Sequence, residues 1–386
     1  MSGTANEEYF QASVRHAVEV RRCTQGVVVE ILKLLDASDK DVTAKLRARL
    51  GELGLTGARS DYKAKRLRSI LTEITLLRTE AFRAINDQTL PEMEDYGRLE
   101  GRVEEGLLEA SIPIEFILHS VSADKLAAIV TNSPFEGQIL GKWFSQLEAQ
   151  DADRIRKAIT LGYANGETID EIVRRVVGTR ANNYQDGAMA ISRRNAESIV
   201  RTSINHISNA AREQVWNANS DILGGVRWVS VLDGRTTPVC QGRDGQIYPL
   251  DSGPRPPAHF NCRSIVVAVI DGVALVGNRP YVTDTRTRKK REVDFRRMAK
   301  EQKKTIQEVR SAWAEANIGT TPSATTYNDW LKKQSPTFQD KVLGPKRGDL
   351  FRQGNLPVQA FTDRAGNQIT LDRLKDMYPD AWARAF

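Results

Sequence analysis

Two cysteines and one histidine in the middle of the chain are the residues whose types and spacing suggest chemistry. Cys240, His259 and Cys262 follow the spacing Cys-x18-His-x2-Cys, and they include two of the three cysteines and one of the four histidines of the sequence. Thiolates and imidazoles are the usual ligands of zinc, and a closed structural site needs four ligands. The fourth would be a water or one of three carboxylates in the same stretch, those of Asp233, Asp244 and Asp251.

A second interpretation of the same residues needs no metal. Cys240 and Cys262 would then be small buried residues or a local disulfide, with His259 at the surface. A thiol nucleophile with a histidine base is disfavoured, because no third group that could orient the base is evident in the loop. The sequence also lacks a Walker A loop, GxGxxG after a strand, HExxH, GxSxG and the zinc deaminase signature.

These residues are expected to be positioned by a strand, a turn-rich loop and a second strand. Residues 226–232 are mostly β-branched or apolar, which predicts a half-buried strand. The apolar run Ile265–Ile270 predicts another, which Asp271-Gly272 would join in a hairpin to residues 273–276. The loop between the two strands carries signals for turns, a short strand and a proline-rich bend, at Asp233-Gly234, Asp244-Gly245, Ile247-Tyr248 and 254–257.

Length and composition predict an α+β protein of two or three domains. The 386 residues suggest a mainly helical N-terminal region (1–150), a small strand-and-loop core with flanking helices (151–280), and a basic helix, linker and short helical C-terminal cap (281–386). Three cysteines exclude a disulfide scaffold and fit a reducing compartment. We expect no signal peptide, because the N-terminus is polar and acidic with no apolar core after it. We expect no membrane association, because no run of about 18 apolar residues exists.

Apolar residues at helical spacing predict the flanking helices. Val27, Ile31, Leu34 and Leu35 form one stripe, which resumes at Leu46 after a polar break. Thr168 and Glu171 form a capping box that opens a helix ending at Gly178. Two further helices are predicted over residues 153–162 and 192–217; the second carries His206, which we expect to be structural or at the surface.

A strongly basic stretch follows the second strand, between Thr285 and Lys304. With a net charge of +7, it suggests contact with nucleic acid or acidic protein, although a solvated helix face explains it equally well. A linker is expected over residues 319–326. The candidate nucleic-acid contacts are Arg286, Arg288, Lys289, Lys290, Arg291, Arg296 and Arg297.

Four ordered elements of this sequence resemble the phage Mu F-like minor head proteins, also called phage head morphogenesis proteins. They are Arg201-Thr202 in a helix, Asp-x-Arg-Thr-x-x-x-Cys over 233–240, Asp244-Gly245, and Pro-Pro-x-His-x-x-Cys-Arg over 256–263. The resemblance covers most of residues 140–375. Many members have cysteines where this chain has Thr237 and Ser264, so the thiols that would complete a cysteine-rich zinc site are absent here.

The resemblance implies a non-enzymatic minor component of a tailed-phage or prophage head. It would join the procapsid in few copies near the portal and act in head assembly and in DNA packaging or delivery. The implied partners are the portal, major capsid or scaffolding protein and packaged DNA, first in the host cytoplasm and then inside the virion. The alternative is a metal-dependent hydrolase or nuclease that uses the loop of Cys240, His259 and Cys262.

In the structural interpretation the loop is a brace whose ends are tied together by polar contacts or by the thiols. No cofactor is required, and the one candidate is a single structural zinc at Cys240, His259 and Cys262. The residues assigned to this loop motif are Asp233, Arg235, Thr236, Cys240, Asp244, Gly245, Pro257, His259, Cys262 and Arg263.

Overall fold

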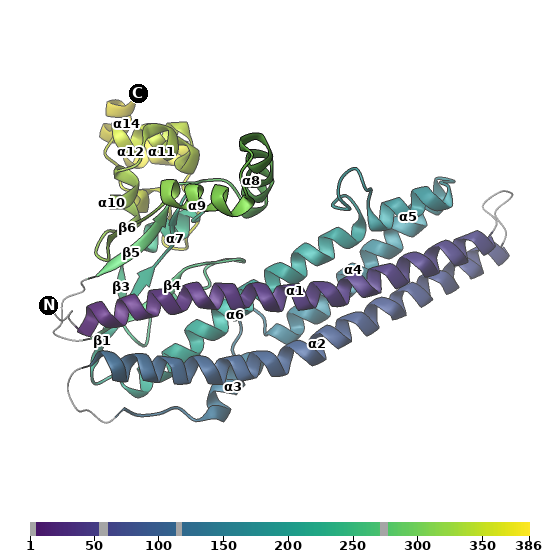
Figure 1. The fold of residues 1–386 in the computed structure, drawn as a ribbon, viewed down its shortest axis with the longest axis horizontal. Coiled ribbons are helices and arrows are strands. Elements are labelled where there is room, and N and C mark those ends of the chain that lie inside the picture. Colours follow the sequence, from purple (N-terminus) through teal and green to yellow (C-terminus); the bar gives the residue numbers. More distant parts are fainter. Residues whose placement is uncertain (1–4, 54–60, 113–117, 271–276) are drawn as a thin grey trace.

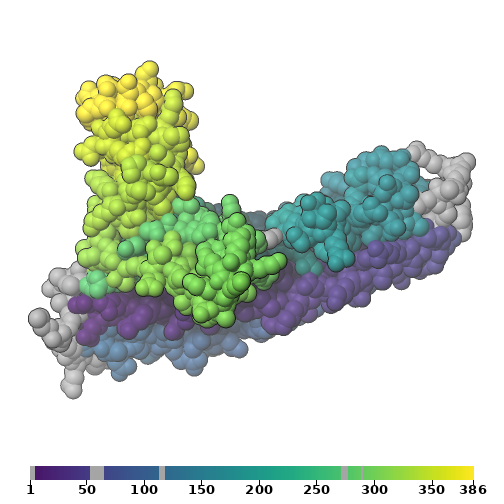
Figure 2. Space-filling view, turned by 45° about the horizontal axis from the view of Figure 1, so that its top comes forward, coloured from purple at the N-terminus to yellow at the C-terminus, as the bar shows by residue number. Residues whose placement is uncertain are grey.

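A computed structural model describes residues 5–53, 61–112, 118–270 and 277–386, apart from the side chains of residues 53, 61–64, 288 and 289. Long helices form an extended bundle, and two small sheets at one end connect it to a helical cap, so the predicted α+β class is confirmed (Figure 1). In the space-filling view the cap projects from the bundle (Figure 2).

The bundle and its connections consist of α1 (Ala5–Leu53), α2 (Asp61–Ser111), α3 (Ala123–Asn132), α4 (Leu140–Ala164), α5 (Ile169–Val177) and α6 (Ala188–Ala218). The middle of the chain forms β1 (Leu223–Val229), β2 (Leu232–Asp233), α7 (Pro238–Arg243), β3 (Ile247–Tyr248), β4 (Ile265–Ile270) and β5 (Asn278–Val282). The rest comprises α8 (Arg288–Gln302), α9 (Ile306–Asn317), β6 (Ile318–Pro322), α10 (Tyr327–Lys332), α11 (Pro336–Leu343), α12 (Pro345–Arg352), the 3-10 helix η1 (Val358–Phe361), α13 (Leu371–Met377) and α14 (Pro379–Ala385).

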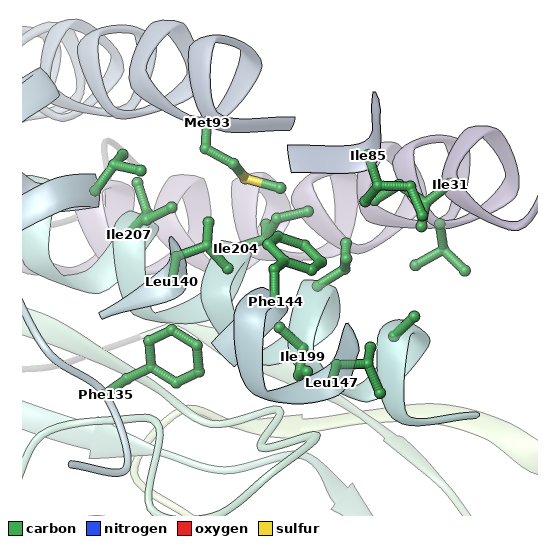
Figure 3. Close-up of a cluster of buried hydrophobic side chains, with 14 of the residues drawn as sticks. Ile31, Ile85, Met93, Phe135, Leu140, Phe144, Leu147, Ile199, Ile204 and Ile207 are labelled. Atoms are coloured by element: carbon green, nitrogen blue, oxygen red, sulfur yellow. The ribbon is translucent and has the colours of Figure 1, made fainter. Parts of the chain in front are cut away.

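Two apolar clusters hold the bundle together; the first draws on α1, α2, α3, α4 and α6, and the second on α1, α2, α4, α5 and α6. Phe144 and Leu147 of α4 point toward Ile199 and Ile204 of α6, and Met93 of α2 approaches from the other side (Figure 3). The 49 residues of α1 extend about 74 Å at a rise of 1.5 Å per residue, so this helix reaches both ends of the bundle.

A buried arginine inside the bundle explains the polar break in the first helical stripe. Arg78 of α2 donates to Asp39 at 2.6 Å and to Asp151 of α4 at 2.6 Å, and also to Ser38 at 3.2 Å. Ser38 and Asp39 therefore face the interior, and α1 continues through the expected break without interruption. Burying these charges is tolerated because they are paired with one another.

A second polar network ties the other end of the bundle to the sheets. Arg212 of α6 donates to Glu104 of α2 at 2.7 Å, and the Trp216 indole N–H donates to the same carboxylate at 2.6 Å. The hydroxyl of Tyr9 on α1 also donates to Glu104. Tyr9 and Trp216 belong to the apolar cluster that covers β1 and β4, so this network fixes three helices against the first sheet.

The two sheets share no strand, and their strands alternate along the chain, because β2 of the second sheet lies between β1 and β3 of the first. The first has the order β3-β1-β4 and is antiparallel, with Trp228 opposite Val266. The second has the order β2-β5-β6, in which β2 and β5 are parallel and β5 and β6 antiparallel. The chain leaves the first sheet after Val229 and enters the second at Leu232, so the residues between them lie where the sheets meet.

Several local predictions are confirmed and others are wrong. The Thr168–Glu171 capping box and the stop at Gly178 are present. The helix expected over 153–162 is part of the longer α4. The linker expected over 319–326 is wrong at its start, where residues 319–322 belong to β6, because β5 offers their backbone groups a partner. The second half of the predicted hairpin, 271–276, lies outside the described residues.

The C-terminal cap has its own apolar core, centred on Trp330 and Phe361. The helices α8 and α9 form a smaller unit around Phe295 and Val309. The division into regions 1–150, 151–280 and 281–386 stays a prediction. Among the described residues, no helix combines the length and the apolar character needed to cross a bilayer.

His206 on α6 lies inside the bundle, as a structural residue would. Its ring is 5.5 Å from that of Phe135, and its Nε2–H donates to the carbonyl of Ser133 at 3.2 Å. Burial lowers the pKa of His206 to about 4, although the hydrogen bond to Ser133 opposes this shift. The folded state therefore favours the neutral imidazole.

This burial predicts a pH dependence of stability. His206 has the ordinary pKa of 6.5 in the unfolded chain and a pKa of about 4 in the folded protein. Its contribution to the free energy of unfolding is therefore complete above about pH 6.5 and is lost as the pH falls toward 4. The difference between the two pKa values corresponds to at most about 3 kcal/mol of unfolding free energy. Replacing His206 with Gln should flatten this part of the pH profile in urea unfolding measured between pH 7 and 4. An unchanged profile in the variant would contradict the prediction.

Candidate functional site

The loop motif occupies the junction between the bundle, the two sheets and the cap. We call residues 230–264 the signature loop. It leaves β1, passes through β2, the short helix α7 and β3, and returns into β4. The helix α7 was not predicted; it begins at Pro238, a residue suited to the first turn of a helix. This helix places Cys240 opposite the segment that carries His259 and Cys262.

Cys240, His259 and Cys262 do come together, as their spacing suggested. The two sulfur atoms are 3.8 Å apart, and Cys240 Sγ lies 3.4 Å from His259 Nε2. All three potential ligand atoms lie within 4.8 Å of one another, and both cysteines are free and buried. A disulfide between them is therefore absent from this structure, and His259 is half-buried rather than at the surface.

The orientation of His259 suits a metal ligand. Its Nδ1–H donates to the carbonyl of Phe260 at 2.8 Å, which leaves the Nε2 lone pair directed at the two sulfurs. Such a hydrogen bond from the distant ring nitrogen is the usual way in which a protein fixes a metal-binding histidine. The hydroxyl of Thr237 lies 2.8 Å from the same Nε2. It stands at the open side of the cluster, where many relatives are expected to have cysteine.

The three ligand atoms fit a tetrahedral zinc ion. Zinc–sulfur bonds of about 2.3 Å and zinc–nitrogen bonds of about 2.0–2.1 Å place two sulfurs about 3.8 Å apart and a sulfur and a nitrogen about 3.6 Å apart. The observed separations are 3.8 and 3.4 Å. The carboxylates of Asp233 and Asp244 are excluded as the fourth ligand, because Arg263 binds the first and Arg279 binds the second. Asp251 is exposed and does not belong to the group of ligand atoms that meet here. A fourth ligand would therefore be Thr237 or a water.

The thiols have unequal acidities. A hydrogen bond from Cys240 lowers the pKa of Cys262 below its usual range; burial opposes this shift, and His259 supports it. The same hydrogen bond and burial raise the pKa of Cys240. The hydrogen bond with Cys262 raises the pKa of His259, against the effect of its burial. Cys262 is therefore the thiol that ionises more readily, and a thiolate is the form that binds a metal ion.

Asp233 organises one side of the signature loop. Arg263 grips this carboxylate with both Nη atoms, at 2.6 and 2.8 Å, and Arg235 approaches it at 3.4 Å. The hydroxyl of Thr236 donates to it at 3.2 Å. Burial would raise the pKa of Asp233, but the contacts with Arg263 hold that pKa below its usual range. Asp233 is therefore bound by both arginines of the loop motif, Arg235 and Arg263.

Asp244 organises the other side, with partners that the sequence did not identify. It accepts hydrogen bonds from the backbone N–H of Ser230 at 2.6 Å and of Tyr327 at 2.6 Å. Its main partner is Arg279 of β5, whose Nη atoms lie 2.9 and 3.0 Å from the two carboxylate oxygens. Both side chains of this pair are at most 2% exposed. This single carboxylate thus connects β1, β5 and α10.

Two further motif residues shape the backbone. Gly245 has φ +82°, and a Cβ there would come within 2.8 Å of the Thr326 side chain, so glycine suits both the conformation and the space. Pro257 follows Pro256 through a cis peptide bond just before His259. Neither residue offers a catalytic group, and both set the path of the loop around the cluster.

The basic stretch is only partly available to a ligand. Arg286 is bound by Asp284 at 2.7 Å and by Asp294 at 2.8 Å, and Arg297 lies 3.4 Å from Asp294. Arg291 packs over the Trp313 ring at 4.8 Å. Lys290 and Arg296 are exposed, whereas the side chains of Arg288 and Lys289 lie outside the described residues. The candidate contacts are therefore not one continuous exposed face.

A cavity of about 1210 Å³ opens beside the cluster, and we call it the arginine cleft. Its walls come from α1, α6, the signature loop and α8, and they include Thr237, His259 and Cys262. Segments distant in sequence meet here, with Arg21 of α1 facing Arg235 and Arg263 of the loop. The sequence did not single out Arg21, because it lies on an otherwise ordinary helix.

Residues 153–267 match the family described as Phage Mu protein F like protein, as the resemblance in sequence predicted. This segment runs from α4 to β4 and contains the helix α6, the cluster and Asp233. No curated protein and no solved structure was found to match the chain.

The pairing of Asp244 predicts a large effect from a small change. Replacing Asp244 with Asn keeps the shape but leaves the Arg279 charge buried without a carboxylate, which should destabilise the fold by about 3–5 kcal/mol. Asp251→Asn is the matched control, since Asp251 is an exposed aspartate of the same loop. Chemical denaturation of both variants measures the difference. Equal stabilities would show that the buried pair does not hold the junction together.

Proposed function

We propose that this Mu F-like protein is a minor component of a tailed-phage head that joins the procapsid in few copies near the portal. The match over residues 153–267 supports a role in head morphogenesis, with the protein in the virion or its assembly pathway. In our proposal it acts in head assembly and in DNA packaging or delivery. Its partners are the portal, the major capsid or the scaffolding protein.

The observation that carries this proposal is that the motif residues bind one another. Asp233 is held by Arg263 and Asp244 by Arg279, so both motif carboxylates are committed to ion pairs that tie the loop to itself and to β5. A structural brace needs such mutual pairing, whereas an active site needs polar groups left free for a substrate. This arrangement favours a structural protein over an enzyme.

The bundle offers long surfaces for partner proteins. Exposed apolar residues are spread along three helices: Val18 and Val29 on α1, Leu76 and Leu99 on α2, and Leu161 on α4. Each is between 37% and 57% exposed. Spread in this way, they suit contacts with a large assembly better than a compact binding pocket.

We also propose that Cys240, His259 and Cys262 hold one structural zinc ion, completed by Thr237 or a water. When bound, zinc would cross-link α7 to the segment before β4 and so supply folding free energy to the junction. Arg263 is adjacent in sequence to one of the ligands and binds Asp233, so the metal cluster and the brace would stabilise each other.

A metal-dependent hydrolase or nuclease remains the second candidate. The observation that favours it is the position of the cluster at the wall of the arginine cleft, where an open fourth ligand position would face a cavity. Such an enzyme would lose turnover and keep its fold when His259 is replaced. The brace would lose stability without losing any reaction.

The zinc proposal predicts about one zinc per chain by mass spectrometry of the metal content. Cys262→Ser and His259→Gln should lose the metal and lower the melting temperature. Cys23→Ser is the control, because Cys23 is exposed on α1. The proposal would be contradicted if the wild-type protein contained no zinc after expression in zinc-containing medium. It would also be contradicted if the Cys262→Ser variant retained zinc. Phosphodiester hydrolysis by the wild type that disappears in a stably folded His259→Gln variant would favour the enzyme instead.

The virion role predicts that the chain is present in particles induced from its host. Quantitative mass spectrometry of purified particles should find it at few copies relative to the major capsid protein. Crosslinking in the same particles should connect α1 or α2 to the portal or to a neighbouring capsid protein. Detection in the cell lysate alone, with none in particles, would refute the proposed role.

A further inference from the structure

The arginine cleft contains more positive charge than its structural contacts require. Seven arginines line it, against two glutamates. Some of these charges are neutralised: Arg212 by Glu104, and Arg201 by the lining residue Glu197. The second lining glutamate, Glu292, binds Arg310 outside the cleft. An excess of arginine charge therefore remains on the walls.

This excess is concentrated where the signature loop meets α1 and α8. Arg235 and Arg263 share the single carboxylate of Asp233. Arg21 donates to the backbone carbonyl of Arg263, and Arg291 donates to the carbonyl of Arg286 at 3.1 Å. Within the described part of the chain, neither Arg21 nor Arg291 forms an ion pair with a carboxylate. Four guanidinium groups thus line this part of the cleft, and Asp233 pairs with only two of them.

The electrostatic consequence is visible at two of these arginines. Burial and the charge of Arg263 together lower the pKa of Arg21 to about 10, against the opposing effect of Asp233. Burial and the charge of Arg235 lower the pKa of Arg291 in the same way. Cations that are partly desolvated and close to one another are stabilised by any anion that enters the cleft.

We propose that the arginine cleft binds a single strand of nucleic acid through its phosphate groups. Guanidinium groups suit phosphates because they can donate two parallel hydrogen bonds to the same group. Phe260, a half-buried aromatic residue on the wall, offers a surface on which a base can stack. This inference does not depend on the virion role, and it places the contact in a cleft that includes Arg21, Arg235 and Arg263, outside the basic stretch.

The size and surroundings of the cleft favour a single strand. At about 1210 Å³ it slightly exceeds the usual pocket for a drug-sized ligand, so a few nucleotides fit, whereas a duplex would reach only the rim. The positive charge is distributed over three elements, with Arg21 on α1, Arg235 and Arg263 in the signature loop, and Arg291 and the exposed Arg296 on α8. A single strand carries one negative charge per nucleotide and is flexible enough to contact several of these arginines. A single small anion would contact few of them.

The test compares two pairs of exposed cations with the same change of charge. Arg235→Gln/Arg296→Gln removes two residues that line the cleft, and Arg297→Gln/Lys300→Gln removes two on α8 that do not. Binding of a fluorescein-labelled oligothymidylate is followed by fluorescence anisotropy at several salt concentrations. The cleft pair should weaken binding about tenfold and reduce the slope of log affinity against log salt by about 1.4, from two lost phosphate contacts. The control pair should cause a clearly smaller loss.

Three results would overturn the proposal. Equal losses in both pairs would mean that the basic surface attracts the strand without the cleft. Competition by polyglutamate as strong as that by unlabelled oligothymidylate would assign the cleft to an acidic polypeptide. Tighter binding of a duplex of equal length, with the same dependence on Arg235 and Arg296, would exclude the preference for a single strand. Arg21→Gln is a further variant with a change inside the cleft. Melting temperatures of all variants show whether each compared protein is folded.

Discussion

The buried pair between Asp244 and Arg279 is the interaction on which the centre of this structure depends. Asp244 ends the short helix α7, and Arg279 belongs to β5 of the second sheet. Their ion pair, together with the N–H groups of Ser230 and Tyr327, holds the first sheet, the second sheet and the cap at one point. A charge pair with almost no exposure is stable only when its hydrogen bonds are satisfied, and here both carboxylate oxygens are used. The geometry of the signature loop therefore depends on contacts made far outside it.

Similar polar networks recur inside the helical bundle. Arg78 joins α1, α2 and α4 through Asp39 and Asp151, and Glu104 joins α2 to α6 through Arg212 and Trp216. Apolar stripes allow long helices to slide relative to one another, because neighbouring layers of a stripe are alike. A buried charge with one matching partner penalises every shifted register. In this bundle the two networks lie toward opposite ends, and the second also orients the helices that cover β1 and β4.

The cluster of Cys240, His259 and Cys262 shares one segment, residues 259–263, with the arginine cleft. His259 and Cys262 contribute to the cluster, Arg263 binds Asp233, and all three line the cleft. A change in the cluster would therefore alter the cleft, and an anion in the cleft would lie close to the ligands. This proximity is why the structural and catalytic interpretations use the same residues. Measurements of turnover, metal content and strand binding distinguish these interpretations, because each measurement reports a different property of the segment.

The sequence by itself determined the features that depend on local order. Apolar spacing indicated α1 and α6, and the Thr168–Glu171 box and Gly178 marked both ends of α5. The order of four motifs indicated the resemblance to the family that residues 153–267 match. The spacing of Cys240, His259 and Cys262 suggested their meeting, since a turn-rich loop between two strands brings its ends together. Tertiary structure alone decided that Arg279 binds Asp244, that Arg21 enters the cleft and that residues 319–322 form a strand. The physical reason is that periodicity and capping act over a few residues, whereas a charge or a strand edge finds its partner only when distant segments have packed.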